Sequence, residues 1–237
     1  MGVRIAVINR SSLVSAGDVS RVAGALSTQV ADDYSPVWGL EAEIAVAEPG
    51  ALPASVWQLV ILDDSDQANA LGYHELTKSG APLGKVFVRS VRDSGGEWSV
   101  AASHELLEMM ADPDINLAAE GYDPESPGSP AFFAYENCDP VEGDTYTVGG
   151  VVVSDFVYPA FFEMNPPPHS KFDRLGLLGK PFSLRPGGYI SVLPIGKGHT
   201  WKQIFGDQSR ALLLQPKPGG RRFRRMLPRK DWRRSTE

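Results

Sequence analysis

The hydrophobic pattern of the first hundred residues alternates between strand and helix periods. A run of apolar, mostly β-branched residues at positions 3–9 predicts a strand. Between residues 18 and 33 the apolar positions recur every three or four residues, which predicts a helix whose first turn is capped by Ser15 or Asp18. Three further apolar runs predict strands at residues 41–46, 57–62 and 85–91.

A longer apolar segment at residues 97–111 predicts a second helix. It follows a Ser-Gly-Gly turn and ends at Asp112, because Pro113 disfavours helical geometry in the residue before it. Apolar side chains are spread around most of its circumference: Val100, Ala101, Ala102, Leu106, Leu107, Met109 and Met110. A helix of this composition is expected to be buried on most sides.

The pattern of the chain changes after Asp112. Proline and glycine become frequent, and the remaining apolar runs, at residues 131–135, 151–158 and 189–193, are short. This change predicts an irregular C-terminal half that wraps or extends the first half. Together the elements predict an α/β (α+β) fold with a mixed sheet covered by helices, in a single domain over residues 1–216.

The composition narrows the class of protein. Of 237 residues, 42% are hydrophobic and 22% are charged, as in soluble globular proteins. The single cysteine, Cys138, excludes an internal disulfide framework and a cysteine-rich zinc finger. The sequence opens without the apolar run of a secretory signal, and no stretch approaches the ~20 apolar residues of a membrane span. We therefore expect a cytoplasmic protein without a membrane span.

Charge is distributed unevenly along the chain. Residues 217–237 contain nine Lys or Arg and two acidic residues, whereas residues 1–216 contain 14 basic and 27 acidic residues. A basic tail of this kind attracts nucleic acid or an anionic surface weakly and without sequence preference. The alternative is a solvated terminus, or one that docks on the acidic part of the chain. We treat residues 217–237 as a separate basic tail.

The predicted second helix contains the sequence His-Glu-Leu-Leu-Glu at residues 104–108. His104 and Glu108 are four residues apart and therefore lie on one face, one turn apart. Glu105, about 100° around the helix, flanks them. Burying unpaired charge is costly, and a metal cation between these groups would supply a partner. A chance match is expected in roughly one such chain in a hundred, and the alternative is that the three side chains face water or pair with arginine.

The same residues resemble a known family. The sequence HELLE is similar to the H-E-x-x-H helix of zincin metallopeptidases, with Glu in place of the second His. The wider pattern GKVFVRSV, SHELLEMMADP and YENCDPVEGDTY resembles a group of bacterial and phage zincin-like proteins with H-E-x-x-E, over most of residues 1–205. The resemblance implies a zincin-like mixed sheet with an active-site helix. It also implies that residues 85–91, just before that helix, form the edge strand along which substrate backbone binds.

The resemblance also implies a ligand set and a catalytic base. His104 and Glu108 would bind zinc, and Glu105 would activate the attacking water as a general base. A third protein ligand is needed, and Glu136 is our choice, because glutamate-type zincins take a glutamate from well downstream. The alternatives for this ligand are Asp139, Asp112 and Asp114. Asp112 and Asp139 are also suited to holding the histidine ring in place.

One histidine among the ligands changes the expected chemistry. Two carboxylates and one imidazole place more negative charge on the ion than the common set of two histidines and a glutamate. The ion is then a weaker Lewis acid, and the site suits other divalent cations as well as Zn²⁺. The sequence predicts a metal-dependent hydrolase, similar to a metallopeptidase, that acts on a peptide or protein. The alternative is a catalytically inactive zincin-fold protein that retains the metal for structure or partner binding.

Several other features compete for function. Residues 112–123 place Asp, Asp and Asn at the first ligand positions of a calcium loop, but lack its glycine and its final glutamate. His74 is followed by Glu75 but has no second ligand four residues later, and we interpret it as a loop residue or a substrate contact. A zincin also needs a hydrogen-bond donor for the oxyanion, and Tyr146, Tyr158 and His169 are eligible.

Overall fold

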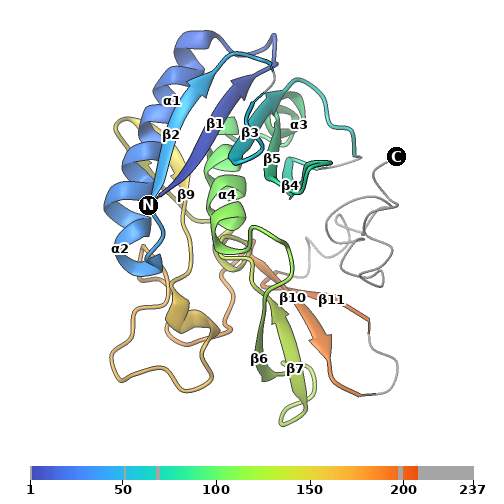
Figure 1. Ribbon diagram of the computed structural model, residues 1–237. Coiled ribbons are helices and arrows are strands. Elements are labelled where there is room, and N and C mark those ends of the chain that lie inside the picture. Colours follow the sequence, from blue (N-terminus) through green and yellow to red (C-terminus); the bar gives the residue numbers. More distant parts are fainter. Residues whose placement is uncertain (1, 51, 68–69, 197–199, 208–237) are drawn as a thin grey trace. The chain divides into compact units, whose positions relative to one another are not determined.

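The computed structural model describes residues 2–50, 52–67, 70–196 and 200–207 (Figure 1). Two compact units make up the chain. The first comprises Met1–Ile115 and Asp144–Asp155, and the second comprises Asn116–Gly143 and Phe156–Glu237. The prediction of one domain over residues 1–216 stays a prediction. The predicted basic tail, residues 217–237, lies outside the described residues.

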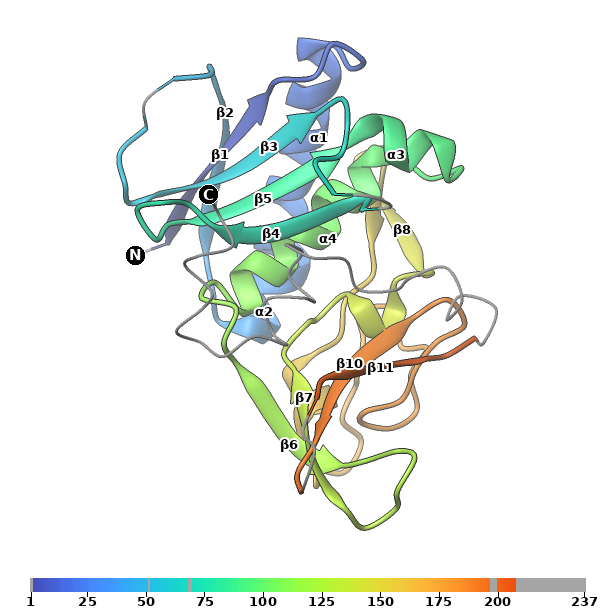
Figure 2. The same ribbon diagram turned by 90° about the vertical axis from the view of Figure 1, so that its right-hand side faces the viewer.

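A five-stranded mixed sheet forms the centre of the first unit. Its strands are β1 (Val3–Asn9), β2 (Ala42–Ala47), β3 (Val56–Leu62), β4 (Gly72–Leu76) and β5 (Pro82–Phe87). They lie in the order β2-β1-β3-β5-β4, and all neighbours are parallel except the pair of β4 and β5 (Figure 2). The chain therefore has the mixed α/β content that the sequence predicts.

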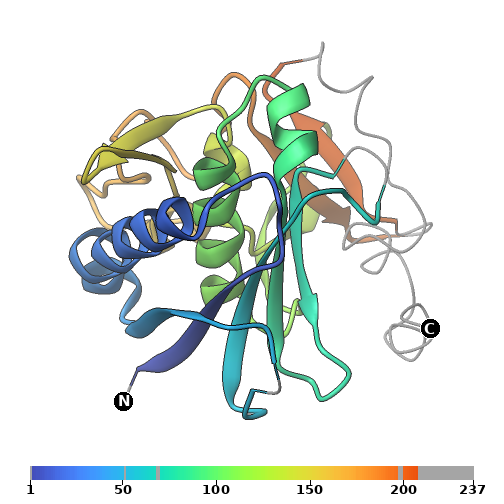
Figure 3. The ribbon, with the colours of Figure 1, turned by 90° about the horizontal axis from the view of Figure 1, so that it is seen from above.

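Two helices cover one face of this sheet. Helix α1 (Ala16–Thr28) and helix α4 (Trp98–Ala111) lie on the same side, as the view from above shows (Figure 3). Ser15 caps α1 and forms a reciprocal capping box with Asp18, so both predicted capping residues are used. Helix α1 continues as a π-helix, Gln29–Tyr34, and then as the short helix α2, Ser35–Trp38. Wider turns of this kind are rare, and they frequently occur next to functional sites.

The sheet is buried on both faces at its centre. In β1 the consecutive residues Ile5, Ala6, Val7 and Ile8 are all buried. Because side chains alternate between faces, Ile5 and Val7 point to the face that α1 and α4 cover. Ala6 and Ile8 pack in a second small cluster on the opposite face, with Val56 and Val60 of β3. Burial on both sides explains why β1 is apolar without interruption.

The predicted edge strand is wrong in position. Residues 85–91 were expected to form one strand at the sheet edge, but β5 ends at Phe87 and helix α3 (Val88–Asp93) follows. Strand β5 lies between β3 and β4, and the edge strand is β4. The hydrophobic pattern does not predict β4, because its sequence Gly-Tyr-His-Glu-Leu contains a glycine and two ionisable residues among five positions.

The second unit is built on an antiparallel sheet. Its strands, in the order β11-β10-β7-β6, are Lys202–Phe205, Tyr189–Pro194, Pro130–Ala134 and Ala118–Tyr122. Aromatic rings fill its core: the ring centroid of Phe182 lies 4.4 Å from that of Phe133 and 5.9 Å from that of Phe161. Short 3-10 turns at Asp139–Val141 and Pro159–Phe162 separate these strands from long irregular segments. The irregular second half is thus confirmed.

The calcium interpretation of residues 112–123 is wrong. An EF-hand loop connects two helices, whereas Ala118–Tyr122 forms strand β6 in this chain. The carboxylate of Asp123, at the last loop position, accepts hydrogen bonds from Lys202 Nζ at 2.9 Å. Among the residues that the structure describes, no helix is both long and apolar enough to cross a lipid bilayer.

Candidate metal centre

Helix α4 carries the candidate site and is largely buried, as predicted. Glu97 is its N-cap residue and Asp112 its C-cap residue. Glu108 is 0% exposed and Glu105 is 6% exposed, whereas the side chain of His104 is 12% exposed. The sequence therefore places two carboxylates inside the protein, where their charge must be balanced by nearby groups.

A second histidine reaches this helix from the edge strand β4. His74 is fully buried, and strand alternation directs it to the face that α4 covers, while Tyr73 and Glu75 point to the other face. His74 Nδ1 lies 3.7 Å from Glu105 Oε2 and 3.9 Å from Glu108 Oε2. The interpretation of His74 as a loop residue is wrong, since it is a strand residue in the core.

The carboxylate of Glu108 lies between the two histidines. Its Oε1 is 3.3 Å from His104 Nε2, while its Oε2 is the atom that faces His74. The donor atoms of His74, Glu105 and Glu108 all lie within 4.8 Å of one another. Imidazole nitrogen and carboxylate oxygen are the donors that zinc, manganese and iron accept in proteins. The arrangement therefore fits a divalent cation.

Two glycines of the sheet make room for Glu105. Gly84 of β5 is the cross-strand partner of His74. A Cβ on Gly72 would lie 2.8 Å from Cγ and 3.0 Å from Oε1 of Glu105, and one on Gly84 would lie 3.7 Å from the Glu105 Cβ. Glu105 thus lies directly against the backbone of β4 and β5, next to the cross-strand pair of His74 and Gly84. A side chain at position 72 would occupy the space that this carboxylate uses.

Replacing Gly72 by alanine is expected to destabilise the protein by about 1–3 kcal/mol, because the new Cβ overlaps Glu105 and also lies 2.9 Å from the Lys85 carbonyl oxygen. The measurement is urea unfolding followed by circular dichroism. Gly24→Ala is the matched control: no described atom lies within 4 Å of the added Cβ, and Gly24 is in helix α1. That change should stabilise by up to ~1 kcal/mol. Equal stability of Gly72→Ala and the wild type would contradict the close approach.

A buried polar network holds α4 from its other side. The Ser103 hydroxyl donates to Gln29 Oε1 at 2.8 Å and accepts from the backbone N–H of Ser154 at 3.1 Å. Gln29 Nε2 donates to the Ser154 carbonyl oxygen at 3.0 Å and to the Tyr146 hydroxyl at 3.1 Å. Ser154 and Tyr146 belong to the hairpin of β8 (Thr145–Val148) and β9 (Val151–Ser154). The residue before His104 is therefore fixed by hydrogen bonds to two other elements.

Tyr146, one of the three residues eligible as oxyanion donors, belongs to this network. The Tyr146 hydroxyl donates to Asp33 Oδ2 at 2.8 Å and so has a structural partner in the first unit. Tyr158 and His169 belong to the second unit, where His169 is exposed and has a positive φ of 67°.

The residues considered as third ligand are divided between the units. Glu136 follows β7 in a loop and is 4% exposed, and Asp139 begins a 3-10 turn; both belong to the second unit. Asp112 is buried at the end of α4, whereas Asp114 is exposed. Strand β7 (Pro130–Ala134) covers most of the apolar run predicted at residues 131–135, and the role of Glu136 as a ligand stays a prediction.

The opposite face of β4 and β5 carries a separate polar cluster. Lys85 Nζ lies 2.8 Å from Asp66, 2.9 Å from Glu75 and 2.7 Å from the Tyr73 hydroxyl. Burial raises the pKa of Tyr73. Burial opposes the charge of Lys85, but its hydrogen bonds, first of all to Asp66, raise the lysine pKa overall. Both groups therefore keep their protons at neutral pH, which suits a structural anchor and not a base.

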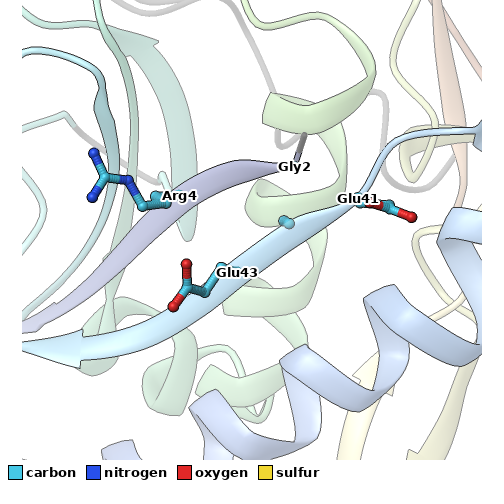
Figure 4. A pocket seen from close by; sticks show the side chains of 5 residues that line it. Gly2, Arg4, Glu41 and Glu43 are labelled. Atoms are coloured by element: carbon cyan, nitrogen blue, oxygen red, sulfur yellow. The ribbon is translucent and has the colours of Figure 1, made fainter.

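A hollow on the first unit lies away from these clusters, at the start of β1 and β2. Its lining consists of Gly2, Arg4, Glu41, Ala42 and Glu43. Arg4 and Glu43 are in register on the adjacent strands, and both are exposed (Figure 4). This lining contains neither histidine nor cysteine, and it offers charge without a nucleophile or a nitrogen ligand.

Comparison with known proteins does not extend this assignment. No protein-family model, curated protein or solved structure matches the chain. The zincin-like assignment stays a prediction, and the chemistry of the site is argued from its own residues.

Proposed function

We propose that the protein is a metal-dependent hydrolase, similar to a metallopeptidase, whose active site is on helix α4. The observation that supports it most is the buried cluster around the H-E-x-x-E sequence, in which His74 lies near Glu105 and Glu108, and His104 lies near the other oxygen of Glu108. Buried carboxylates of this kind are balanced either by protonation or by a cation. Adjacent imidazole nitrogens favour the cation, because they add donors that bind metal but carry no negative charge.

Each residue of the helix has a distinct task in this proposal. His104 and Glu108 would hold the ion, which is Zn²⁺ or another divalent cation. When bound, the ion would polarise a substrate carbonyl and lower the pKa of a water molecule. Glu105 would accept the proton of the attacking water and return it to the leaving amine. The backbone at Gly72 and Gly84 lies close to the Glu105 side chain and limits where its carboxylate can lie.

Strand β4 favours an extended peptide as substrate. It forms one edge of the five-stranded sheet, and within the described residues no other strand pairs with its outer side. Peptides bind such edges by adding a strand, through main-chain hydrogen bonds that tolerate many sequences. His74 lies on this strand, so a peptide on β4 would lie next to the histidine and carboxylate cluster.

A second candidate function is a metal site without hydrolysis. Glu105 Oε2 is as close to His74 Nδ1 as Glu108 Oε2 is, at 3.7 Å and 3.9 Å. This position also suits Glu105 as a ligand, and a ligating carboxylate is not available as a base. In that case the metal would stabilise the first unit or a partner complex. The two functions differ in what Glu105→Gln does to metal content: a base can be replaced without loss of the metal, whereas a ligand cannot.

The proposal is tested by metal analysis of purified protein. We expect about one divalent ion per chain in the wild type and less than about a tenth of that in His104→Ala, by mass spectrometry of the metal. The control is His169→Asn, which removes an exposed histidine of the second unit. The wild type should also cleave a random peptide mixture, with loss of activity in chelator and recovery with Zn²⁺. The proposal is contradicted if the purified wild type contains no metal and takes up none during dialysis against Zn²⁺.

Residues 217–237, for which we propose weak attraction to nucleic acid or an anionic surface, lie outside the described residues. Their high density of arginine supports the proposal, since arginine binds phosphate through paired donors.

A further inference from the structure

We propose that His74 is a ligand of the cation, and that it supplies the nitrogen donor that helix α4 lacks at position 108. This inference rests on the proposed metal site, but it does not require hydrolysis. The H-E-x-x-E sequence provides one imidazole, whereas the zincin sequence it resembles provides two. The missing nitrogen comes from strand β4, which is far from α4 in the sequence but packed against it in the fold.

The distances between the histidine nitrogens and the oxygens of Glu105 and Glu108 are close to those between two ligands of one ion. Direct N–H···O bonds are about 2.7–3.2 Å long. His74 Nδ1 lies 3.7 Å from Glu105 Oε2 and 3.9 Å from Glu108 Oε2, and His104 Nε2 lies 3.3 Å from Glu108 Oε1. Two donors at about 2.0–2.2 Å from one tetrahedral ion lie roughly 3.3–3.6 Å apart. The gap between His104 and Glu108 falls in that range, and the two His74 gaps are slightly longer, so a small shift of His74 would bring its Nδ1 to ligand distance from an ion held by Glu105 and Glu108.

The surroundings of His74 support a ligand better than a core histidine. Its side chain is 0% exposed, and its cross-strand neighbour Gly84 offers no side chain to pack against it. Its Nδ1 faces oxygens of Glu105 and Glu108, and Glu105 lies against Gly72 and Gly84. An imidazole in this position adds a donor without adding negative charge. It therefore does not add to the electrostatic penalty of gathering two carboxylates around one site, as a third carboxylate would.

A nitrogen from His74 would change which cations bind. With one imidazole and two carboxylates the site would suit hard cations such as Mg²⁺ or Ca²⁺. A second imidazole shifts the preference toward Zn²⁺, Co²⁺ and Ni²⁺. As the third protein ligand it would leave the ion a stronger Lewis acid than a further carboxylate such as Glu136 would, because a neutral ligand donates less charge to the ion. His74 thus offsets the chemical effect of having Glu at position 108.

Cobalt binding tests the assignment without an activity assay. Metal-free protein is titrated with Co²⁺, and the visible ligand-field spectrum and the affinity are measured for the wild type, His74→Ala and Glu75→Ala. Removal of a ligand should weaken Co²⁺ binding by more than about 100-fold and alter the spectrum, whereas loss of an outer group costs about 10–100-fold and leaves the spectrum unchanged. Glu75→Ala is the control, because Glu75 is the next residue of β4 and points away from the site.

A cysteine at the same position gives a positive readout. If His74 ligates the ion, Co²⁺ bound to His74→Cys should show an intense near-ultraviolet band from thiolate-to-cobalt charge transfer. Glu75→Cys should not show it, and the wild type, whose Cys138 is fully buried, sets the baseline. Circular dichroism of the metal-free proteins confirms that each variant is folded. This second variant keeps the test decisive if His74→Ala fails to fold.

The outcomes separate this inference from the proposed function. A band in His74→Cys, with a large loss of affinity in His74→Ala, supports the ligand role. Wild-type Co²⁺ binding with no band in folded His74→Cys, or with an unchanged spectrum in His74→Ala, would overturn it and leave the metal site on His104 and Glu108 standing. No Co²⁺ or Zn²⁺ binding by the wild type would overturn both.

Discussion

Glu105→Gln is expected to retain the bound metal and to lose peptide hydrolysis by about 10²–10⁴-fold, the usual contribution of a general base. The amide has nearly the shape of the carboxylate, so it still fits the space above Gly72 and Gly84. It cannot accept a proton at neutral pH, and the attacking water would then be activated less effectively. The measurement is kcat/KM on the best peptide from the mixture, with metal content determined on the same samples.

The control for this variant is Glu43→Gln, an identical change at an exposed position of β2. It should leave both quantities at the wild-type level. Loss of metal from Glu105→Gln would show that Glu105 is a ligand, and the non-hydrolytic function would then be the better one. Full activity of Glu105→Gln with the metal in place would remove Glu105 from the mechanism altogether.

The sequence predicts the helix part of the site because that part is local. Residues four apart share one helix face in any helix, so His104 and Glu108 could be paired without knowing the fold. Helix boundaries were also readable, since Asp112-Pro113 ends α4 and Ser15 caps α1. These signals act over a single turn of chain, and tertiary packing did not alter them.

The strand part of the site could not be predicted, because it depends on pairing between distant segments. His74 faces α4 only because β4 pairs antiparallel with β5 in the register that sets His74 opposite Gly84. A shift of one residue would direct His74 to the other face. The pattern of β4 is also weak, since its buried position is occupied by a histidine instead of an apolar residue. Gly72 was a usable signal: a glycine two residues before a strand histidine marks a close approach of another element.

The misplaced edge strand has a similar cause. Residues 85–91 read as one apolar run, yet the chain changes from strand to helix at Val88. Val88 and Val91 are both buried, and their spacing of three fits a helix as well as it fits an irregular strand. Propensity alone favours the strand here, because valine is common in sheets. Packing of α3 beside α4 overrides that preference.

Metal removal is expected to lower the free energy of unfolding of the wild type strongly and that of Glu108→Gln little. An ion that binds only the folded protein stabilises it by about 4 kcal/mol when its free concentration is 1,000 times its Kd. Without the ion, the buried carboxylates of Glu105 and Glu108, with donor atoms within 4.8 Å of each other, oppose folding through desolvation and mutual repulsion.

Glu108→Gln removes one of the two buried charges and one ligand at the same time. In chelator this variant should therefore be as stable as the wild type or more stable, whereas with saturating Zn²⁺ the order should be reversed. Urea unfolding of both proteins, with and without Zn²⁺, measures the four free energies. Glu120→Gln, an exposed change in strand β6, serves as the control and should follow the wild type in both conditions. Equal stabilisation of wild type and Glu108→Gln by Zn²⁺ would show that Glu108 does not bind the ion. A reversal of the stability order identifies Glu108 as a ligand, because the effect of the substitution then depends on whether Zn²⁺ is bound.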